Sequence, residues 1–232
     1  MKPLAIDLFC GLGGWTDGLL AEGYDVIGFD IERHVYGEHR YPAQLVVQDV
    51  LTLHGSQFRT ADLIVASPPC QAYSYRAMPW KKAKALPPPD NSLFESCFRI
   101  QREACEAAGR HIPLIVENVR GAQPWVGRAR WNFGSFYLWG DVPALMPVTF
   151  KASKVPGFRF DGSGRSFQTA SVDRHVKLGG SWFHGYRQGQ GPRNHGSKSK
   201  CRKMASAMIA KIPEPLSRYI AATFRPAFAE GA

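Results

Sequence analysis

Paired cysteines, long apolar runs and internal repeats are all missing from this sequence of 232 residues, and each absence excludes a class of protein. The five cysteines are an odd number without a Cys-x-x-Cys pair, which argues against a disulfide framework or a zinc knuckle. No apolar run approaches the roughly 20 residues of a membrane-spanning helix. The N-terminus has no signal-peptide pattern. We therefore expect a soluble, cytoplasmic protein that needs no metal.

The overall composition is ordinary, with 44% hydrophobic and 21% charged residues. These values exclude disorder as a description of the whole chain. The length suits one domain with a real hydrophobic core and a small appendage.

The positive charge is concentrated in one quarter of the chain. Residues 151–203 contain 12 Lys and Arg but only two acidic residues, so this segment carries the entire net charge of +10. The segment is also rich in glycine and interleaved with aromatic residues, which favours a nucleic-acid surface because phosphates supply the matching charge. A solvated basic insert is the alternative. A membrane-surface role is less favoured, since no amphipathic helix is visible here.

Apolar strands and helical patterns alternate along the first 120 residues, which predicts an α/β fold with a doubly wound parallel sheet. We divide the chain into a catalytic core (1–150), a small loop-rich basic region (151–203) and a C-terminal helix that packs back on the core (204–232). The expected strands are 4–9, 24–30, 45–47, 63–66 and 112–116, with antiparallel edge strands in 133–139. The expected helices are 15–22, 92–108 and 203–224, the last broken by Pro213 and Pro215.

A glycine turn follows the first expected strand, in the sequence DLFCGLGGW over 7–15. Such a turn brings the backbone and a helix N-terminus close to a ligand, although many α/β proteins have one for packing alone. Asp30 ends the second strand at the distance typical of an acid that binds ribose hydroxyls. Asp49 follows the third strand. The glycine spacing does not fit a dinucleotide, so an adenosyl ligand without a pyrophosphate suits this pattern better.

A second motif, SPPCQAYS over 67–74, directly follows the fourth strand. The two prolines make a stiff turn that projects Cys70 at the sheet edge where ligands bind. Cys97 and Cys105 differ, because they lie in apolar helical positions typical of structural cysteines. Residues 71–89 form a long loop of the kind that often acts as a lid. Its basic residues should favour the reactive thiolate of Cys70: Arg76, Lys81, Lys82 and Lys84.

The third motif is Glu117-Asn118-Val119 at the end of the fifth strand. A carboxylate there lies at the same sheet edge as Cys70, and partial burial would raise its pKa and let it donate a proton. A helix-capping Glu-Asn pair is the alternative.

These three motifs in this order resemble those of the C5-cytosine DNA methyltransferases, most closely over residues 4–74 and again over 112–121. The resemblance implies the class I S-adenosylmethionine-dependent methyltransferase fold and a compact enzyme like those of phages and prophages. It also implies S-adenosylmethionine as cofactor, S-adenosylhomocysteine as product, and double-stranded DNA as partner of a monomer. The implied cofactor-binding residues are Phe9, Gly11, Leu12, Gly13, Gly14, Asp30, Ile31, Asp49, Val50, Pro69 and Leu93.

The same resemblance implies the catalytic roles. Cys70 is the expected nucleophile toward cytosine carbon-6, and Glu117 contacts N3 and the amino group of the base. Arg130, or second Arg128, is the expected arginine at O2. The expected DNA contacts come from the long loop and the basic region: Gln71, Ser74, Arg76, Lys81, Lys82, Arg187, Arg193, Lys198 and Lys200.

The sequence departs from the family pattern in two places. Ile209-Ala210-Lys211 replaces the usual Gly-Asn-Ser before the Pro-x-Pro-Leu frame, and the usual arginine after the loop is missing. Three other functions stay open: an RNA cytosine-5 methyltransferase of the same fold, a non-catalytic DNA-binding relative, and a nicotinamide-dependent Rossmann enzyme. The last leaves the Pro-Pro-Cys turn unexplained.

Replacing Lys198 and Lys200 together with alanine should weaken DNA binding and flatten its salt dependence, because each phosphate contact releases counterions. The slope of log K against log salt should fall by about two. Fluorescence anisotropy with a DNA duplex over a salt series measures this slope, and an unchanged slope would remove both lysines from the interface.

Overall fold

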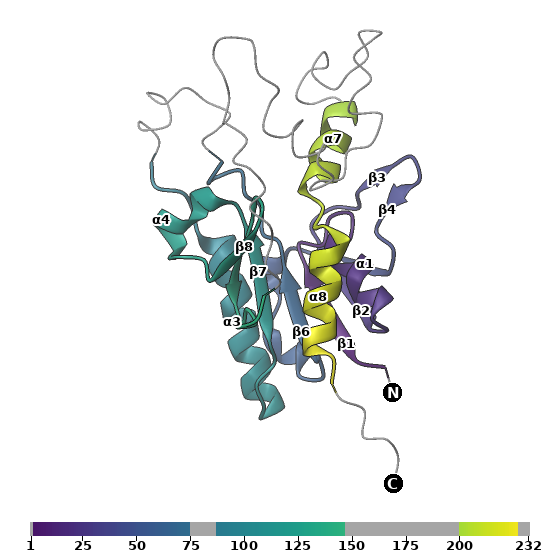
Figure 1. Ribbon diagram of the computed structural model, residues 1–232, viewed down its shortest axis with the longest axis vertical. Helices are drawn as coiled ribbons and strands as arrows, with labels where there is room; N and C mark the ends of the chain where they lie inside the picture. Colours follow the sequence, from purple (N-terminus) through teal and green to yellow (C-terminus); the bar gives the residue numbers. More distant parts are fainter. Residues whose placement is uncertain (1, 75–86, 147–199, 227–232) are drawn as a thin grey trace.

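The computed structural model describes residues 2–74, 87–146 and 200–226, and every structural statement below concerns these ranges. A seven-stranded sheet in the order β5-β2-β1-β6-β7-β9-β8 forms the centre of the molecule (Figure 1). The elements are β1 (Leu4–Leu8), α1 (Gly14–Ala21), β2 (Asp25–Asp30), β3 (Val35–Tyr36), β4 (His39–Arg40), β5 (Gln44–Val47), η1 (Val50–Thr52), η2 (Gly55–Phe58), β6 (Leu63–Ala66), α3 (Ser92–Ala108), β7 (Leu114–Asn118), η4 (Arg120–Ala122), α4 (Gln123–Val126), β8 (Trp131–Phe133), β9 (Phe136–Gly140), α7 (Lys200–Ala210) and α8 (Glu214–Phe224).

The five strands from β5 to β7 are parallel to one another, as the alternating pattern predicts. Central strand β6 has the sequence Leu-Ile-Val-Ala, and all four residues are fully buried. An uninterrupted apolar run is what a parallel strand covered on both faces requires, because neither of its sides meets water.

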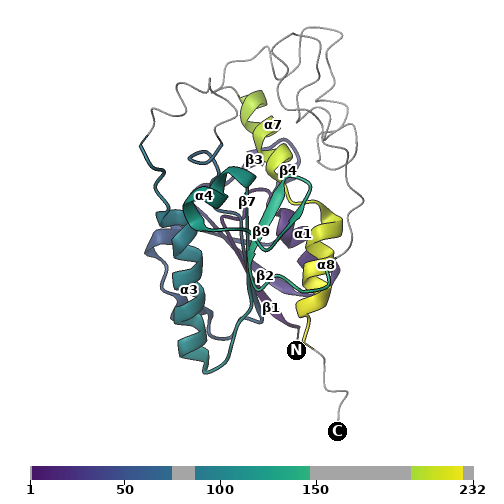
Figure 2. The same ribbon diagram turned by 60° about the vertical axis from the view of Figure 1, so that its left-hand side comes forward.

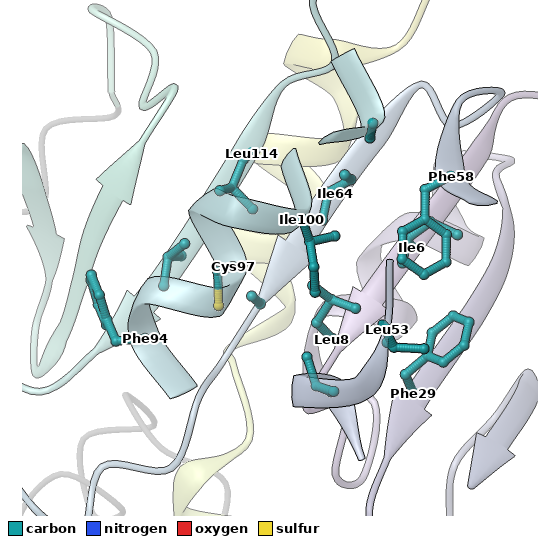
Figure 3. Packing of buried hydrophobic residues seen from close by; sticks show 14 of the residues in the cluster. Ile6, Leu8, Phe29, Leu53, Phe58, Ile64, Phe94, Cys97, Ile100 and Leu114 are labelled. Atoms are coloured by element: carbon teal, nitrogen blue, oxygen red, sulfur yellow. The ribbon is translucent and has the colours of Figure 1, made fainter. Parts of the chain in front are cut away.

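Helix α3 covers one face of the sheet, and its bounds agree with the prediction. Its buried residues Phe94, Cys97, Ile100 and Ala104 recur at helical spacing and pack on alternate side chains of the strands (Figure 3). The helix ends at Gly109, whose left-handed φ of 65° is typical of a C-terminal glycine cap.

Helices α1 and α8 cover the opposite face, side by side (Figure 2). Pro213 precedes α8 and Pro215 lies in its first turn, where a proline costs no helical hydrogen bond. The Tyr24 hydroxyl, next to β2, donates a hydrogen bond to the Ala221 carbonyl at 3.1 Å. Helix α8 therefore packs on the core, whereas the division of the chain into three parts stays a prediction.

The antiparallel edge expected in 133–139 is present as the β8–β9 hairpin, which pairs with β7 through β9. This pairing continues to Glu117 and Asn118, opposite Leu138 and Tyr137. The expectation that Glu117 lies just beyond the strand is therefore wrong. The ladder to β9 keeps the backbone extended for two residues more than the apolar pattern indicates.

The alternation of strands and α-helices is interrupted between β2 and β6. The β3–β4 hairpin and the short 3-10 helices η1 and η2 occupy this stretch. Arg99 and Glu103 of α3 bind their backbone, with Arg99 donating to the Leu53 carbonyl at 2.9 Å and Glu103 accepting from the Gly55 N–H at 2.6 Å. These tertiary contacts supply hydrogen bonds that a regular helix would make within itself. In the described part of the chain no helix is long and apolar enough to cross a membrane.

Replacing Ile100 with alanine should lower the free energy of unfolding by about 2–5 kcal/mol, because it leaves a cavity between α3 and the sheet. Leu145, which is 86% exposed, is the matched control, and its replacement by alanine should change stability by less than about 0.5 kcal/mol. Urea unfolding measures both values. Equal effects of the two substitutions would show that this core is not packed as described.

Candidate active site

The three sequence motifs end at one edge of the sheet. In the parallel register Leu8 lies beside Ala66, and Ala66 lies beside Val116. The Ser67 N–H donates to the Leu8 carbonyl at 3.1 Å. The glycine turn and the Pro-Pro-Cys turn therefore leave the sheet side by side, next to the Glu-Asn pair that ends β7, at the carboxyl ends where α/β proteins bind ligands.

The glycine turn begins with a strained residue. Phe9 has a φ of 56°, the one non-glycine residue with positive φ in the described ranges. A left-handed backbone costs a residue with a side chain roughly 1–2 kcal/mol. The distortion reverses the chain so that the Cys10 N–H reaches the Phe29 carbonyl at 3.1 Å. Backbone strain of this kind is often kept where a ligand must be approached.

Asp30 is tied to the glycine turn. Its Oδ2 accepts the Gly11 N–H at 2.9 Å, and its Oδ1 accepts the Glu32 N–H at 3.3 Å and lies 3.5 Å from Nε2 of His34. Burial raises the pKa of Asp30, but the hydrogen bonds from His34, Gly11 and Glu32 outweigh it, so the pKa falls below its usual value. The Asp30 hydrogen bond raises the pKa of His34 above its usual value. An ionised acid at this place suits the ribose hydroxyls of an adenosyl group.

A second acid lies beneath the turn, on β1. Asp7 is buried, and its Oδ2 accepts a 2.6 Å hydrogen bond from the Thr16 hydroxyl. Its Oδ1 has no hydrogen-bond partner among the described residues. Burial raises the pKa of Asp7 to about 7. A cation bound at the turn would stabilise the ionised form by Coulomb attraction, so this carboxyl fits a positively charged ligand.

The junction of α7 and α8 packs directly on the turn. A Cβ on Gly14 would overlap the Ile212 backbone and approach Cγ of Lys211 to 2.9 Å. Lys211, half-buried, forms an ion pair with Asp17 of α1 at 2.6 Å. Lys211, one of the three residues that depart from the family pattern, and the following Ile212 therefore form a wall of the glycine turn. This wall is built from backbone contact and an ion pair.

The other expected cofactor-binding residues differ in accessibility. Ile31 is 71% exposed, whereas Leu12 and Val50 are buried. Asp49 accepts the Leu51 N–H at 3.0 Å and so caps η1. Pro69 is exposed, Leu93 is half-buried in the first turn of α3, and Gly11 has open space where a side chain would be. With Asp30 and Asp7, these residues fit an adenosyl ligand that carries positive charge.

Cys70 lies in the turn after β6 and is partly exposed. The buried Asn118 amide donates a 2.9 Å hydrogen bond to the Pro68 carbonyl, which fixes the start of this turn against β7. Cys10 and Cys97 are buried instead, and burial raises the pKa of both thiols well above the usual value. Cys105, expected to be structural like Cys97, is partly exposed like Cys70, so exposure alone does not single out the nucleophile and its assignment stays a prediction.

Glu117 is buried in β7 and projects on the same face as Ile115, the face covered by α1 and α8. Asn118 projects on the other face toward Pro68. Glu117 and Asn118, adjacent in β7, thus have different structural surroundings. The first supplies a carboxyl group at the sheet edge, and the second holds the neighbouring turn.

Arg128 and Arg130 lie exposed between α4 and β8. The Arg130 N–H donates to the Leu138 carbonyl at 2.9 Å, which extends the β8–β9 ladder. Trp139 donates from its indole to the Gly127 carbonyl at 2.9 Å. These two hydrogen bonds fix the backbone of residues 127–130, the arginine-bearing arm.

Among the expected DNA contacts, Gln71 is exposed and Ser74 half-buried in the turn after Cys70. Lys200 begins α7, which extends beyond the carboxyl ends of the parallel strands (Figure 1). The remaining expected contacts lie outside the described residues: Arg76, Lys81, Lys82, Arg187, Arg193 and Lys198. Within the described ranges no group of three or more His, Cys, Asp and Glu could hold a metal ion.

Two residues of this region were missed by sequence reasoning. The hydroxyl of Tyr73, a buried residue, donates to Oδ1 of Asn91 at 2.9 Å, and Nδ2 of Asn91 donates to the Trp125 carbonyl at 3.3 Å. Asn91 stands directly before α3, where a side-chain cap is the usual role of asparagine. The sequence alone favours that role, and the structure shows no such cap.

Comparison with known proteins now identifies the family. Residues 4–123, just over half of the chain, match the model of the C-5 cytosine-specific DNA methylase family. The chain belongs to this family. S-adenosylmethionine is accordingly its cofactor, as the glycine turn and Asp30 indicate. The mostly parallel sheet with helices on both faces is the expected class I methyltransferase fold.

Solved structures with some likeness include other methyltransferases. A structure described as a prophage-encoded DNA modification methyltransferase of E. coli is 25% identical, with 52% of this chain and 33% of that chain covered and a TM-score of 0.36. The Entamoeba histolytica methyltransferase EhMeth is 19% identical over 54% and 41%, with a TM-score of 0.39. The chain thus spans about a third to two fifths of their lengths. Because these TM-scores are low, the fold assignment rests on the strand order and the family match.

The Asp30–His34 contact predicts a pH-dependent contribution to stability. Folding raises the pKa of His34, so the contribution is fully present below about pH 6.5 and is lost as the pH rises through the higher pKa of the folded state. Asp30→Asn should therefore destabilise the protein more at about pH 5.5 than at about pH 8.5.

Urea unfolding at both pH values measures the difference. Asp25→Asn, which removes an exposed acid paired with Lys2 at 3.6 Å, is the control and should show no such change between the two values. The same destabilisation by Asp30→Asn at both pH values would show that His34 does not share its proton with Asp30.

Proposed function

We propose that this chain is a DNA (cytosine-5-)-methyltransferase that modifies a cytosine flipped out of double-stranded DNA. The observation that carries the proposal is the Asn118–Pro68 hydrogen bond within the β6–β7 register. It places the Cys70 turn and Glu117 at one sheet edge, next to the glycine turn. The indole of Trp15 in α1 joins the two turns by donating to the Ser67 hydroxyl at 3.0 Å.

The proposed chemistry follows from the weak nucleophilicity of cytosine carbon-5. Addition of the Cys70 thiolate to carbon-6 forms an S–C bond and moves a ring electron pair toward carbon-5. Bound S-adenosylmethionine supplies an electrophilic methyl group. Loss of the carbon-5 proton then restores the ring double bond and expels the Cys70 thiolate.

Two further groups stabilise this addition in the proposal. Negative charge develops at N3 and O2 of the base as the thiolate adds. A protonated Glu117 would donate to N3, and its side chain is buried at the end of β7. An arginine of the 127–130 arm, Arg130 first and Arg128 second, would stabilise the charge at O2.

The substrate must leave its stack before any of these groups reaches it. A base in a duplex is inaccessible, and flipping it out costs a few kcal/mol. Contacts from the exposed turn after Cys70 and from the basic region 151–203 would offset this cost. The net charge of +10 is consistent with a polyanionic partner.

Cys70→Ala should abolish methyl transfer while leaving cofactor binding intact, because it removes one sulfur from an exposed turn. The assay incubates the protein with radiolabelled S-adenosylmethionine and duplex DNA, or in parallel tRNA, and identifies 5-methylcytosine by mass spectrometry. Calorimetry with S-adenosylhomocysteine measures cofactor binding. Cys105→Ala, which removes another partly exposed thiol, is the matched control and should stay active.

Each other outcome is informative. A Cys70→Ala protein that still makes 5-methylcytosine would refute the nucleophile assignment. Labelling of tRNA in place of DNA would change the substrate to RNA. Cofactor binding by the unaltered protein without labelling of either polymer would favour a non-catalytic relative.

A further inference from the structure

The turn that carries Cys70 is held at both ends. Asn118 fixes Pro68 before it, as described above. After it, the Tyr73 N–H donates to the Cys70 carbonyl at 3.0 Å, which closes a tight turn. The ring of Tyr73 is only 3% exposed and belongs to the core on the α3 side of the sheet. Tyr73 is thus the anchor through which the second half of the turn joins the rest of the protein.

The chain beyond Glu117 packs on this anchor. A Cβ on Gly121 would overlap the carbonyl oxygen of Tyr73 and lie 3.3 Å from its carbonyl carbon. Only glycine allows such an approach of the two backbones. Ala122, fully buried, belongs to the same core cluster as Tyr73. The backbone of Tyr73 is therefore fixed from the β7 side.

The hydroxyl of Tyr73 adds a polar link to two further elements. It donates to Oδ1 of Asn91, and Asn91 donates to the Trp125 carbonyl in α4. The side chain of Asn91 makes no capping hydrogen bond to α3. Oδ1 of the preceding Asp90 accepts the Ser92 N–H at 2.8 Å instead. The asparagine amide is therefore committed to Tyr73 and Trp125 in place of its usual role at a helix N-terminus.

This link joins the three pieces that carry the proposed chemistry. Tyr73 follows the nucleophile, Asn91 precedes the cofactor-side residue Leu93, and α4 leads into the arginine-bearing arm. Gln123 of α4 accepts the Ala129 N–H at 3.2 Å, so the arm itself is tied to α4. A change in the position of the Tyr73 side chain would therefore also move the Cys70 turn, the start of α3 and the arginine-bearing arm.

We propose that Tyr73, through the hydrogen bond of its hydroxyl to Asn91, is a positioning residue that sets the place of the Cys70 sulfur relative to the cofactor and the arginine arm. This inference rests on the proposed function for its kinetic consequence. A misplacement of a reacting group by about 1 Å can cost as much as a hundredfold in rate. Loss of one hydrogen bond that leaves the ring in place should cost less, roughly tenfold.

Tyr73→Phe tests the proposal because it removes one oxygen and keeps the packed ring. In single-turnover methylation the rate should fall roughly tenfold, with KM for S-adenosylmethionine and DNA affinity unchanged. Tyr24→Phe is the matched control. It removes another buried hydroxyl, which donates to the Ala221 carbonyl in the core between β2 and α8, and its rate should equal that of the unaltered protein.

A double-mutant cycle identifies the partner. Asn91→Ala should lower the rate to a similar extent, and the Tyr73→Phe/Asn91→Ala protein should be no slower than the slower single variant. Asn91→Asp keeps an oxygen acceptor for Tyr73 but loses the donor to the Trp125 carbonyl, so its rate should lie between those of the unaltered protein and Asn91→Ala. Additive losses in the cycle would show that the two side chains act separately and would overturn the proposal.

Alkylation of Cys70 by iodoacetamide gives a readout that does not depend on methyl transfer. Mass spectrometry follows modification of the Cys70 peptide. The sulfur should react more than threefold faster in Tyr73→Phe, because a less restrained turn exposes it more often, and at an unchanged rate in Tyr24→Phe. If the unaltered protein transferred no methyl group, a faster alkylation would still support the positioning role while the proposed function failed. Unchanged alkylation together with an unchanged methylation rate would refute the positioning role.

Discussion

The hydrogen bond from the Asn118 amide to the Pro68 carbonyl joins the ends of two neighbouring parallel strands, and the arrangement of the candidate active site depends on it. Both groups are buried, so leaving either without a partner would cost about 1–3 kcal/mol. The bond holds the Cys70 turn at a fixed distance along the edge from Glu117. The register of β6 and β7 brings the Cys70 turn next to the end of β7, and the Asn118–Pro68 hydrogen bond then fixes the position of its backbone.

The glycine turn shows how packing and ligand binding share the same residues. Gly11 faces open space, whereas Gly14 is required because the Ile212 backbone lies against it. Asp30 holds the turn by accepting the Gly11 N–H, a contact that needs no cofactor. Contacts within the chain thus fix the backbone of the turn, and a backbone fixed in this way lowers the ordering cost of binding a ligand.

Much of this arrangement is predictable from the sequence because it depends on local pattern. Apolar runs locate the parallel strands, and the helical spacing of apolar residues predicts both ends of α3. The Pro-Pro-Cys turn and Glu117 are found because their residue types carry chemistry. The position of Glu117 inside β7 is not predictable in the same way, since it depends on pairing with the distant strand β9. The hydrogen bond from Tyr73 to Asn91 is also not predictable from the sequence, because an asparagine before a helix ordinarily indicates a cap. The strained φ of Phe9 leaves no trace in composition or periodicity.

The contact between the first and last helices has a consequence for synthesis on the ribosome. The turn after β1 is made well before residues 211 and 212, which pack against it. Until α8 emerges, the apolar face of α1 and β2 has no cover, and a nascent chain must keep it from aggregating. The wall of the glycine turn is therefore completed only after residue 212 has been made. A chain that stopped before this residue would leave the turn and the adjoining face of α1 uncovered.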